Sequence, residues 1–162
     1  AAAAAPLLAE PVFGAATLAV MPLYTLMLAA PRWALTRSLM SGVLPFALMG
    51  AAYAALVVEM ALNGSVLANM SWWGLKGLAS NMSAPLSLSA TWVHLLTLDL
   101  FVARAVYLDG LARGVPTRHS LVLCMMFGPL GYLLHYATVA LARALRRRRE
   151  VAPVVGGAEG AR

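Results

Sequence analysis

A length of 162 residues fits a single domain. The chain is 62% apolar and 11% charged, whereas soluble domains have about 45–50% apolar and about 25% charged residues, so the composition excludes an ordinary soluble protein and indicates a membrane protein. The net charge of +6 does not indicate a nucleic-acid partner, because four of the basic residues form one run, Arg146–Arg149, directly after an apolar stretch, as in a basic anchor beside a membrane span.

The first two predicted membrane spans cover residues 12–30 and 38–62. Each is apolar and about long enough to cross a hydrocarbon core that is about 30 Å thick. Pro22 lies near the centre of the first span and Pro31 ends it, while Glu59 is an acid close to the end of the second.

The rest of the chain adds two more predicted spans. Residues 63–89 contain no clean span and, being broken by glycines and rich in tryptophan, are typical of a loop on the membrane surface. Residues 90–109 and 119–145 are again apolar, and we expect the latter to bend at Gly128-Pro129. The Gly-rich tail, residues 150–162, is expected to be flexible.

These segments predict an all-α membrane protein that is surrounded by lipid. We expect one domain over residues 1–162, with four transmembrane helices in an up-down bundle and an interfacial loop between the second and third. The turns after the first and third spans are short, which favours direct packing of neighbouring helices. Four crossings place both termini on the same side of the membrane.

Ionisable side chains inside apolar spans are costly unless they are paired or protonated, which makes them candidates for a functional site. With a rise of about 1.5 Å per residue, Asp99 falls near the bilayer centre, level with the bend at Pro129. His94, His135 and Glu59 fall together nearer the side on which the chain begins. We predict that these four residues, Asp99, His94, His135 and Glu59, form an acid–base site.

Each of these candidates also has a purely structural interpretation. A protonated Asp99 can donate to a backbone carbonyl that a proline has left without its donor. His94 and His135 can bond each other or Glu59, and either histidine can serve as a ligand for chlorophyll. No other metal site is indicated. Asp109 and the basic residues after it are interpreted as a solvated turn and helix cap.

Four further side chains of the last two spans are candidates for contacts with a substrate or pigment. They are Trp92, Arg104, Phe101 and Tyr132. The alternative interpretation of Arg104 is that its long side chain reaches the lipid headgroups.

Three strings carry a resemblance to a known family: MPLYTLMLAAP in the first span, WVHLLTLDLFVARAVYLDG in the third and TRHSLVLCMMFGPLGYLLH in the fourth. They resemble the plastid membrane family typified by the abscisic-acid-deficient-four protein, which is associated with neoxanthin synthesis. The resemblance implies an integral membrane protein of the thylakoid or envelope that acts on a xanthophyll. It carries over no catalytic residues.

Two functions follow as hypotheses from different classes. The first is a xanthophyll isomerase that converts an epoxide end group to an allene; this needs an acid and a base but no cofactor. The second is a non-catalytic subunit that binds carotenoid or chlorophyll within a photosystem or light-harvesting assembly, because family membership alone does not settle function.

Overall fold

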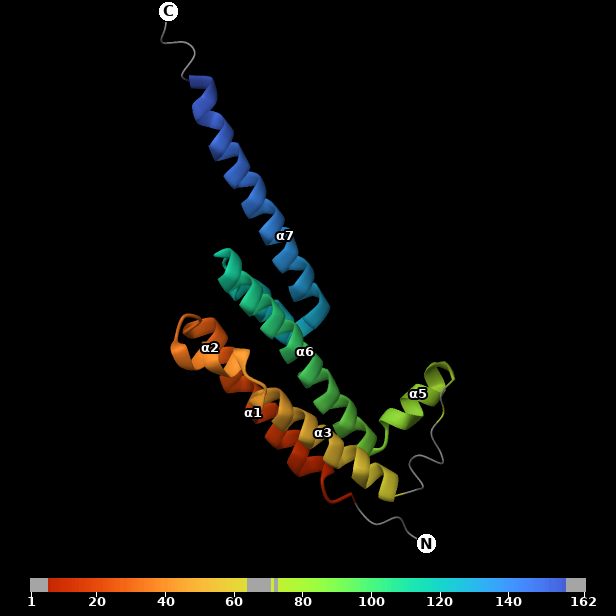
Figure 1. The fold of residues 1–162 in the computed structure, drawn as a ribbon. Helices are drawn as coiled ribbons and strands as arrows, with labels where there is room; N and C mark the ends of the chain where they lie inside the picture. The colour runs from red at the N-terminus through yellow and green to blue at the C-terminus, as the bar shows by residue number, and fades with distance from the viewer. Residues whose placement is uncertain (1–5, 64–70, 72, 157–162) are drawn as a thin grey trace, which may run out of the picture.

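The computed structural model describes residues 6–63, 71 and 73–156, with side chains up to residue 149, and every regular element within these residues is a helix. The order is α1 (Ala9–Ala29), α2 (Ala34–Ser41), α3 (Leu44–Leu62), α5 (Gly74–Met82), α6 (Pro85–Arg113) and α7 (Arg118–Gly156) (Figure 1). Four of them, α1, α3, α6 and α7 as far as Arg149, are long and apolar enough to cross a membrane. The predicted all-α membrane fold is therefore confirmed.

The second predicted span starts later than expected, because the chain breaks into two helices at Gly42. Gly42 has extended backbone angles (φ −78°, ψ 173°) and its N–H closes α2 by bonding the carbonyl of Ser38 at 2.9 Å. Pro45 then lies in the first turn of α3, where its missing N–H costs no hydrogen bond. Residues 34–41 are thus a separate short helix that lies between the two spans.

The third span is longer than the predicted residues 90–109, at both ends. Pro85 occupies its first position, and Gly114 ends it in the left-handed conformation at φ 63°, which glycine adopts without strain. Within the predicted interfacial loop, α5 forms a short helix, whereas residues 64–70 and 72 lie outside the described part of the chain.

The fourth span folds back on itself instead of bending gently. Phe127 has non-helical angles (φ −150°, ψ 61°), and Pro129 beyond it cannot donate a backbone hydrogen bond. The two arms of α7, residues 118–126 and 128–156, then run antiparallel: His119 Nε2 lies 2.9 Å from Thr138 Oγ1, and a Cβ built on Gly131 would collide with the backbone of Cys124 and Ser120. Residues 118–126 descend beside α6, and residues 128–156 return.

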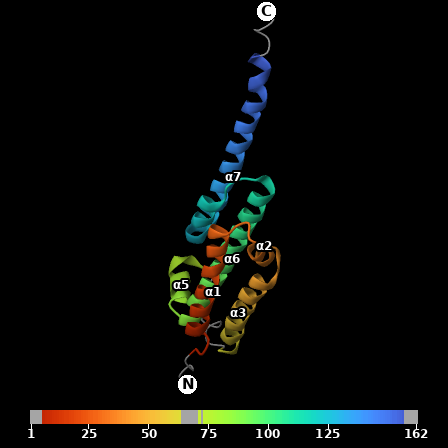
Figure 2. The ribbon, with the colours of Figure 1, turned by 90° about the vertical axis from the view of Figure 1, so that its left-hand side faces the viewer.

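This reversal overturns the prediction that both termini share one side. The end of α7 and the start of α1 lie at opposite ends of the molecule (Figures 1 and 2). The Nη2 of Arg146 donates to the carbonyl of Arg113 at 3.3 Å, which ties the returning arm to the far end of α6. The prediction failed because it assumed a straight crossing after the bend. Part of the predicted tail, residues 150–156, continues α7, and residues 157–162 lie outside the description.

The central element is α6, which packs against α1, α3 and α7. Three hydroxyl groups join α1 and its following turn to α6: Ser89 Oγ donates to the carbonyl of Ala9 at 2.8 Å, Tyr24 Oη to that of Asp99 at 3.0 Å, and Tyr107 Oη to that of Pro31 at 2.6 Å. In an apolar interior such bonds also fix the register of neighbouring helices, since an unpaired carbonyl would be costly. We call the end of the bundle that holds the α1–α2 and α6–α7 connections the turn end.

Candidate functional site

The structure separates the predicted cluster of Glu59, His94 and His135. Glu59 lies at the end opposite the turn end, where its carboxylate accepts from the backbone N–H groups of Leu7 and Leu8 at 2.6 and 3.0 Å. These donors precede α1 and would otherwise lack partners, so Glu59 fastens α3 to the start of α1.

His94 lies on an exposed face of α6, with its ring 5.5 Å from that of Tyr53. His135 contacts Asp109, which lies 15 residues further along α6 than His94 and therefore about 22 Å away along the helix axis. The prediction that His94 and His135 share one depth is therefore wrong. It depended on the straight course of α7.

Asp99 lies against the reversal of α7, next to Gly128. A Cβ built on Gly128 would collide with Asp99 Oδ1, so the absence of a side chain at Gly128 makes room for the carboxyl group. The backbone carbonyl of Asp99 accepts from Tyr24 on α1. The side chain is half-buried between α1, α6 and the turn at Phe127.

Two of the residues predicted to contact a substrate, Trp92 and Arg104, form hydrogen bonds within the protein. Trp92 donates its indole N–H to Thr17 Oγ1 at 2.9 Å. Arg104 donates from Nε to the carbonyl of Met40 at 2.5 Å and stands over the ring of Phe46, 5.3 Å from its centroid. Arg104 thus caps α2, which ends at Ser41 with carbonyls that lack helical donors.

The remaining two aromatic candidates are only partly covered by protein. Phe101 stacks on Phe46 with ring centroids 4.6 Å apart. Tyr132 donates to the hydroxyl of Tyr136 at 3.3 Å on the returning arm of α7. Both rings remain about 40–45% exposed and can face an apolar ligand or lipid.

The most concentrated set of ionisable groups lies at the turn end and centres on Asp109. Arg113 Nε donates to its carboxylate at 2.7 Å, one helical turn away on α6. His135 Nε2 lies 2.8 Å from Oδ2 of the same carboxylate. Because a carboxylate only accepts, Nε2 carries the hydrogen and Nδ1 of the neutral imidazole keeps its lone pair. We call the Asp109–His135 pair the dyad.

One nitrogen of the dyad, Nδ1 of His135, is buried and makes no hydrogen bond to a described residue. His135 is fully buried, and its Nδ1 has no hydrogen-bond partner. Ser120 Oγ is likewise buried without a partner. Since Gly131 faces Cys124 across the hairpin, the antiparallel arms bring Ser120 to the level of His135. Two buried polar atoms without partners among the described residues thus lie at one level in the interior of the bundle.

A cavity of about 220 Å³ lies one helical turn further toward the turn end than Asp109 and His135, which do not themselves line it. Arg113 and Val139 line it, and these residues follow Asp109 and His135 by four positions each. The sequence analysis interprets Asp109 as part of a solvated turn; its i, i+4 spacing to Arg113 is the signal that could have indicated their pair. Only the reversal at Phe127 brings His135 to it, and no local pattern reveals that contact.

The residues described do not gather three His, Cys, Asp or Glu side chains into a group that could hold a metal ion. Among the imidazoles, His94 is exposed and makes only a ring contact. The Nε2 of His135 is committed to Asp109. His94 is thus the histidine with neither ring nitrogen bonded among the described residues, because the exposed His119 bonds Thr138 through Nε2.

The chain matches the family model described as ABA DEFICIENT 4-like over residues 11–135. It is also similar to the chloroplastic protein ABA DEFICIENT 4 of Arabidopsis thaliana, with 37% identity over 138 residues, which is 83% of this chain and 63% of that relative. The chain therefore spans somewhat less than two thirds of the length of this relative. No solved structure matches it.

Proposed function

This chain belongs to the ABA DEFICIENT 4-like family and is a plastid membrane protein, and from that premise we propose that it isomerises a xanthophyll by acid–base chemistry at the Asp109–His135 dyad. The observation that carries the proposal is the imidazole of His135, which holds its lone pair on a buried, unpartnered Nδ1 while its other nitrogen bonds a carboxylate. A carboxylate in this position orients an imidazole and stabilises it when it becomes charged.

The reaction requires only the movement of protons. One group delivers a proton to the oxygen of a 5,6-epoxide as the C6–O bond breaks, and a base removes a proton from C7 as the C6=C7 bond forms. The oxygen stays on C5 as a hydroxyl group, and no electrons are gained or lost. Neutral His135 can take the C7 proton on Nδ1, and the imidazolium that results can pass this proton to the epoxide oxygen, so one centre can perform both steps.

The position of the dyad suits such a substrate. It lies near the turn end, where the polar ring of a membrane-dissolved carotenoid would reach the interface while its polyene stays in the hydrocarbon. The neighbouring cavity has room for part of an end ring. Arg113, already bound to Asp109, keeps that carboxylate in place and offers positive charge beside a developing oxyanion.

The test uses the purified chain in lipid nanodiscs with a xanthophyll 5,6-epoxide as the only added reactant. We expect an allenic product of unchanged mass, identified by its chromatographic retention and absorption spectrum. Empty nanodiscs give the background rate. Failure of the folded protein to convert any 5,6-epoxide xanthophyll would contradict the proposal.

The Asp99→Asn variant distinguishes between two candidate sites for the catalytic acid, Asp99 and Asp109. Asp99 and Asp109 are ten residues apart on α6, about 15 Å along its axis, which is too far for both to act on one epoxide. Because asparagine preserves the shape that fits against Gly128, we expect Asp99→Asn to keep the fold and to convert substrate within about twofold of the unmodified chain. A large loss of conversion by a stable Asp99→Asn protein would move the catalytic acid to Asp99.

A non-catalytic pigment-binding role is the second candidate, and it is favoured by His94. Its imidazole is exposed on a face of α6, beside Tyr53, with no hydrogen bond to any residue that the structure describes. If this is the function, chlorophyll copurifies with the chain, and His94→Leu removes it while leaving the thermal unfolding midpoint unchanged. Carotenoid without chlorophyll in the unmodified protein would contradict this alternative.

A further inference from the structure

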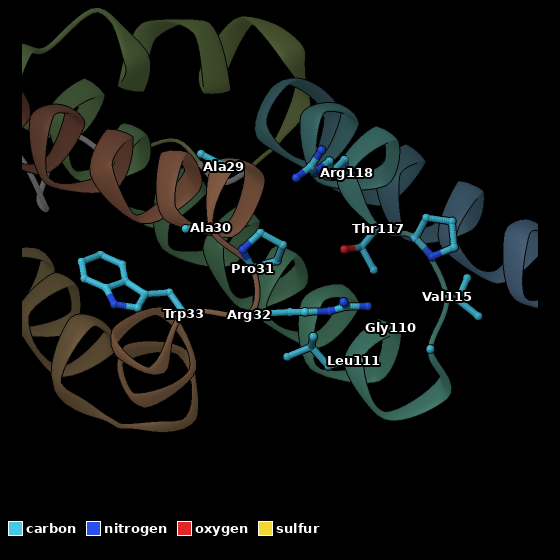
Figure 3. Close-up of a pocket in the computed structure, with 12 residues that line it drawn as sticks. Ala29, Ala30, Pro31, Arg32, Trp33, Gly110, Leu111, Val115, Thr117 and Arg118 are labelled. Atoms are coloured by element: carbon cyan, nitrogen blue, oxygen red, sulfur yellow. The ribbon is translucent and has the colours of Figure 1, made fainter.

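A hollow lies at the turn end, apart from the dyad, and the proposed reaction does not use it. It has a volume of about 680 Å³ and is lined by residues 29–33, 110–111 and 114–118. These segments come from the α1–α2 turn, the end of α6 and the α6–α7 turn (Figure 3). The hollow, which we call the turn-end pocket, therefore lies where three of the candidate membrane spans begin or end.

The carbonyl groups at the ends of these helices are largely satisfied within the protein. The carbonyl of Pro31 accepts from Tyr107 Oη at 2.6 Å, and that of Ala30 accepts from Thr36 Oγ1 at 2.9 Å. At the other wall, the carbonyl of Gly110 accepts from the N–H of Val115 at 3.0 Å. Carbonyl groups at helix C-termini usually lack donors, but these three already accept hydrogen bonds from the protein.

The turn-end pocket also contains hydrogen-bond donors that are not used within the described part of the protein. Arg32 and Arg118 both line the pocket, and neither has a hydrogen-bonded or ion-paired partner within the described residues. The lining includes no acidic side chain. Two guanidinium groups without counter-ions in one hollow attract an anion.

The pocket also contains a buried hydroxyl group. Thr117 is only 9% exposed, and its side chain has no hydrogen-bond partner among the described residues. A Cβ at Gly110 would collide with the methyl group of Thr117, so glycine at that position lets the methyl pack against α6. The hydroxyl then points into the pocket toward Pro31, with Arg32 and Arg118 on either side of it (Figure 3).

We propose that the turn-end pocket binds the phosphate group of an anionic membrane lipid, held by Arg32 and Arg118 with a hydrogen bond from Thr117. A phosphodiester offers several acceptor oxygens and a negative charge, which matches two guanidiniums and one hydroxyl. The remaining walls are apolar, among them Ala29, Leu111 and Val115, and suit the glycerol and upper acyl region. Lipid supplies this group at the depth where spans end.

The test is carried out on the purified chain, reconstituted from vesicles of equal parts phosphatidylglycerol and phosphatidylcholine and then stripped in detergent. Native mass spectrometry measures which lipid is retained. We expect the unmodified chain to retain phosphatidylglycerol, Arg32→Gln or Arg118→Gln each to weaken retention about tenfold, and Thr117→Val to weaken it about threefold.

The matched control is Arg147→Gln, which removes the same charge from an exposed position of α7 outside the pocket and should retain the lipid as the unmodified chain does. Equal losses in the control and the pocket variants would overturn the proposal, since they would indicate a diffuse charge effect. Inorganic phosphate in excess distinguishes the sources of the anion. Lipid that stays bound supports a headgroup site, and lipid displaced from the unmodified chain assigns the pocket to free phosphate and overturns the lipid proposal.

Discussion

Asp109→Asn is expected to lower the rate of epoxide conversion by about 100-fold or more while leaving the fold intact. The carboxylate receives donors from two directions, Arg113 Nε at 2.7 Å and His135 Nε2 at 2.8 Å. An asparagine at this position has one acceptor oxygen, which the guanidinium of Arg113 requires because it can only donate. The amide NH₂ then faces His135 and donates to Nε2.

The consequence is a change of tautomer in the imidazole. With Nε2 accepting, the hydrogen moves to Nδ1, and the lone pair that would take the substrate proton is lost. The measurement is the nanodisc assay, with unfolding midpoints recorded for each variant. Glu59→Gln is the control, because it also converts a hydrogen-bonded carboxylate to an amide but lies at the other end of the bundle. A rate that is unchanged in Asp109→Asn, or reduced equally in Glu59→Gln, would contradict the role of the dyad.

Gly131→Ala is expected to destabilise the reversal of α7 more than any other single methyl group added at a helical glycine of that helix. Its Cβ would collide with the backbone N of Cys124 and the carbonyl oxygen of Ser120. Both are backbone atoms of the facing arm and cannot rotate away, so the two arms must separate. Such overpacking costs about 3 kcal/mol, which corresponds to a fall of about 6–12 °C in the unfolding midpoint of a chain of this size.

Gly50→Ala provides the matched control, since Gly50 lies inside α3 and a Cβ there meets nothing within 4 Å. Alanine is the better helix former by about 1 kcal/mol, so this variant should be as stable as the unmodified chain or more so. The same Gly131→Ala protein should lose epoxide conversion, because separation of the arms carries His135 away from Asp109. A midpoint as high as that of Gly50→Ala would show that the arms do not pack as described.

Most of the secondary structure could be predicted because it depends on local chemistry. Apolar runs predict four helices that are long and apolar enough to cross a membrane. The ends of α6, marked by Pro85 and Gly114, lie beyond the predicted range of 90–109. The direction of the chain after Phe127 could not be predicted in the same way. Gly128-Pro129 indicates a bend, but whether the helix tilts slightly or reverses depends on packing between arms that are distant from the bend.

The candidate functional residues also divide into those whose position depends on local helix geometry and those whose position depends on the course of α7. The helical rise along α6 suffices to predict that Asp99 lies beside the bend at Gly128-Pro129, which the structure shows. His135 was placed at the wrong end, since its position depends on the course of α7. Asp109 depends on the fold in the same way: alone it is a carboxylate near a turn with Arg113 beside it, and only the fold-back pairs it with the buried His135.

The reversal of α7 also determines how charge is distributed across the membrane. Arg146 returns to Arg113, so the basic run that a straight crossing would carry to the far side joins the arginines of the turns. Ten of the eleven arginines then belong to the turn end: Arg32, Arg37, Arg104, Arg113, Arg118, Arg143, Arg146, Arg147, Arg148 and Arg149. The opposite end has Lys76 with Glu10 and Glu59. Positively charged segments resist translocation, and this asymmetry therefore favours insertion with the turn end on the side of the bilayer from which the chain enters.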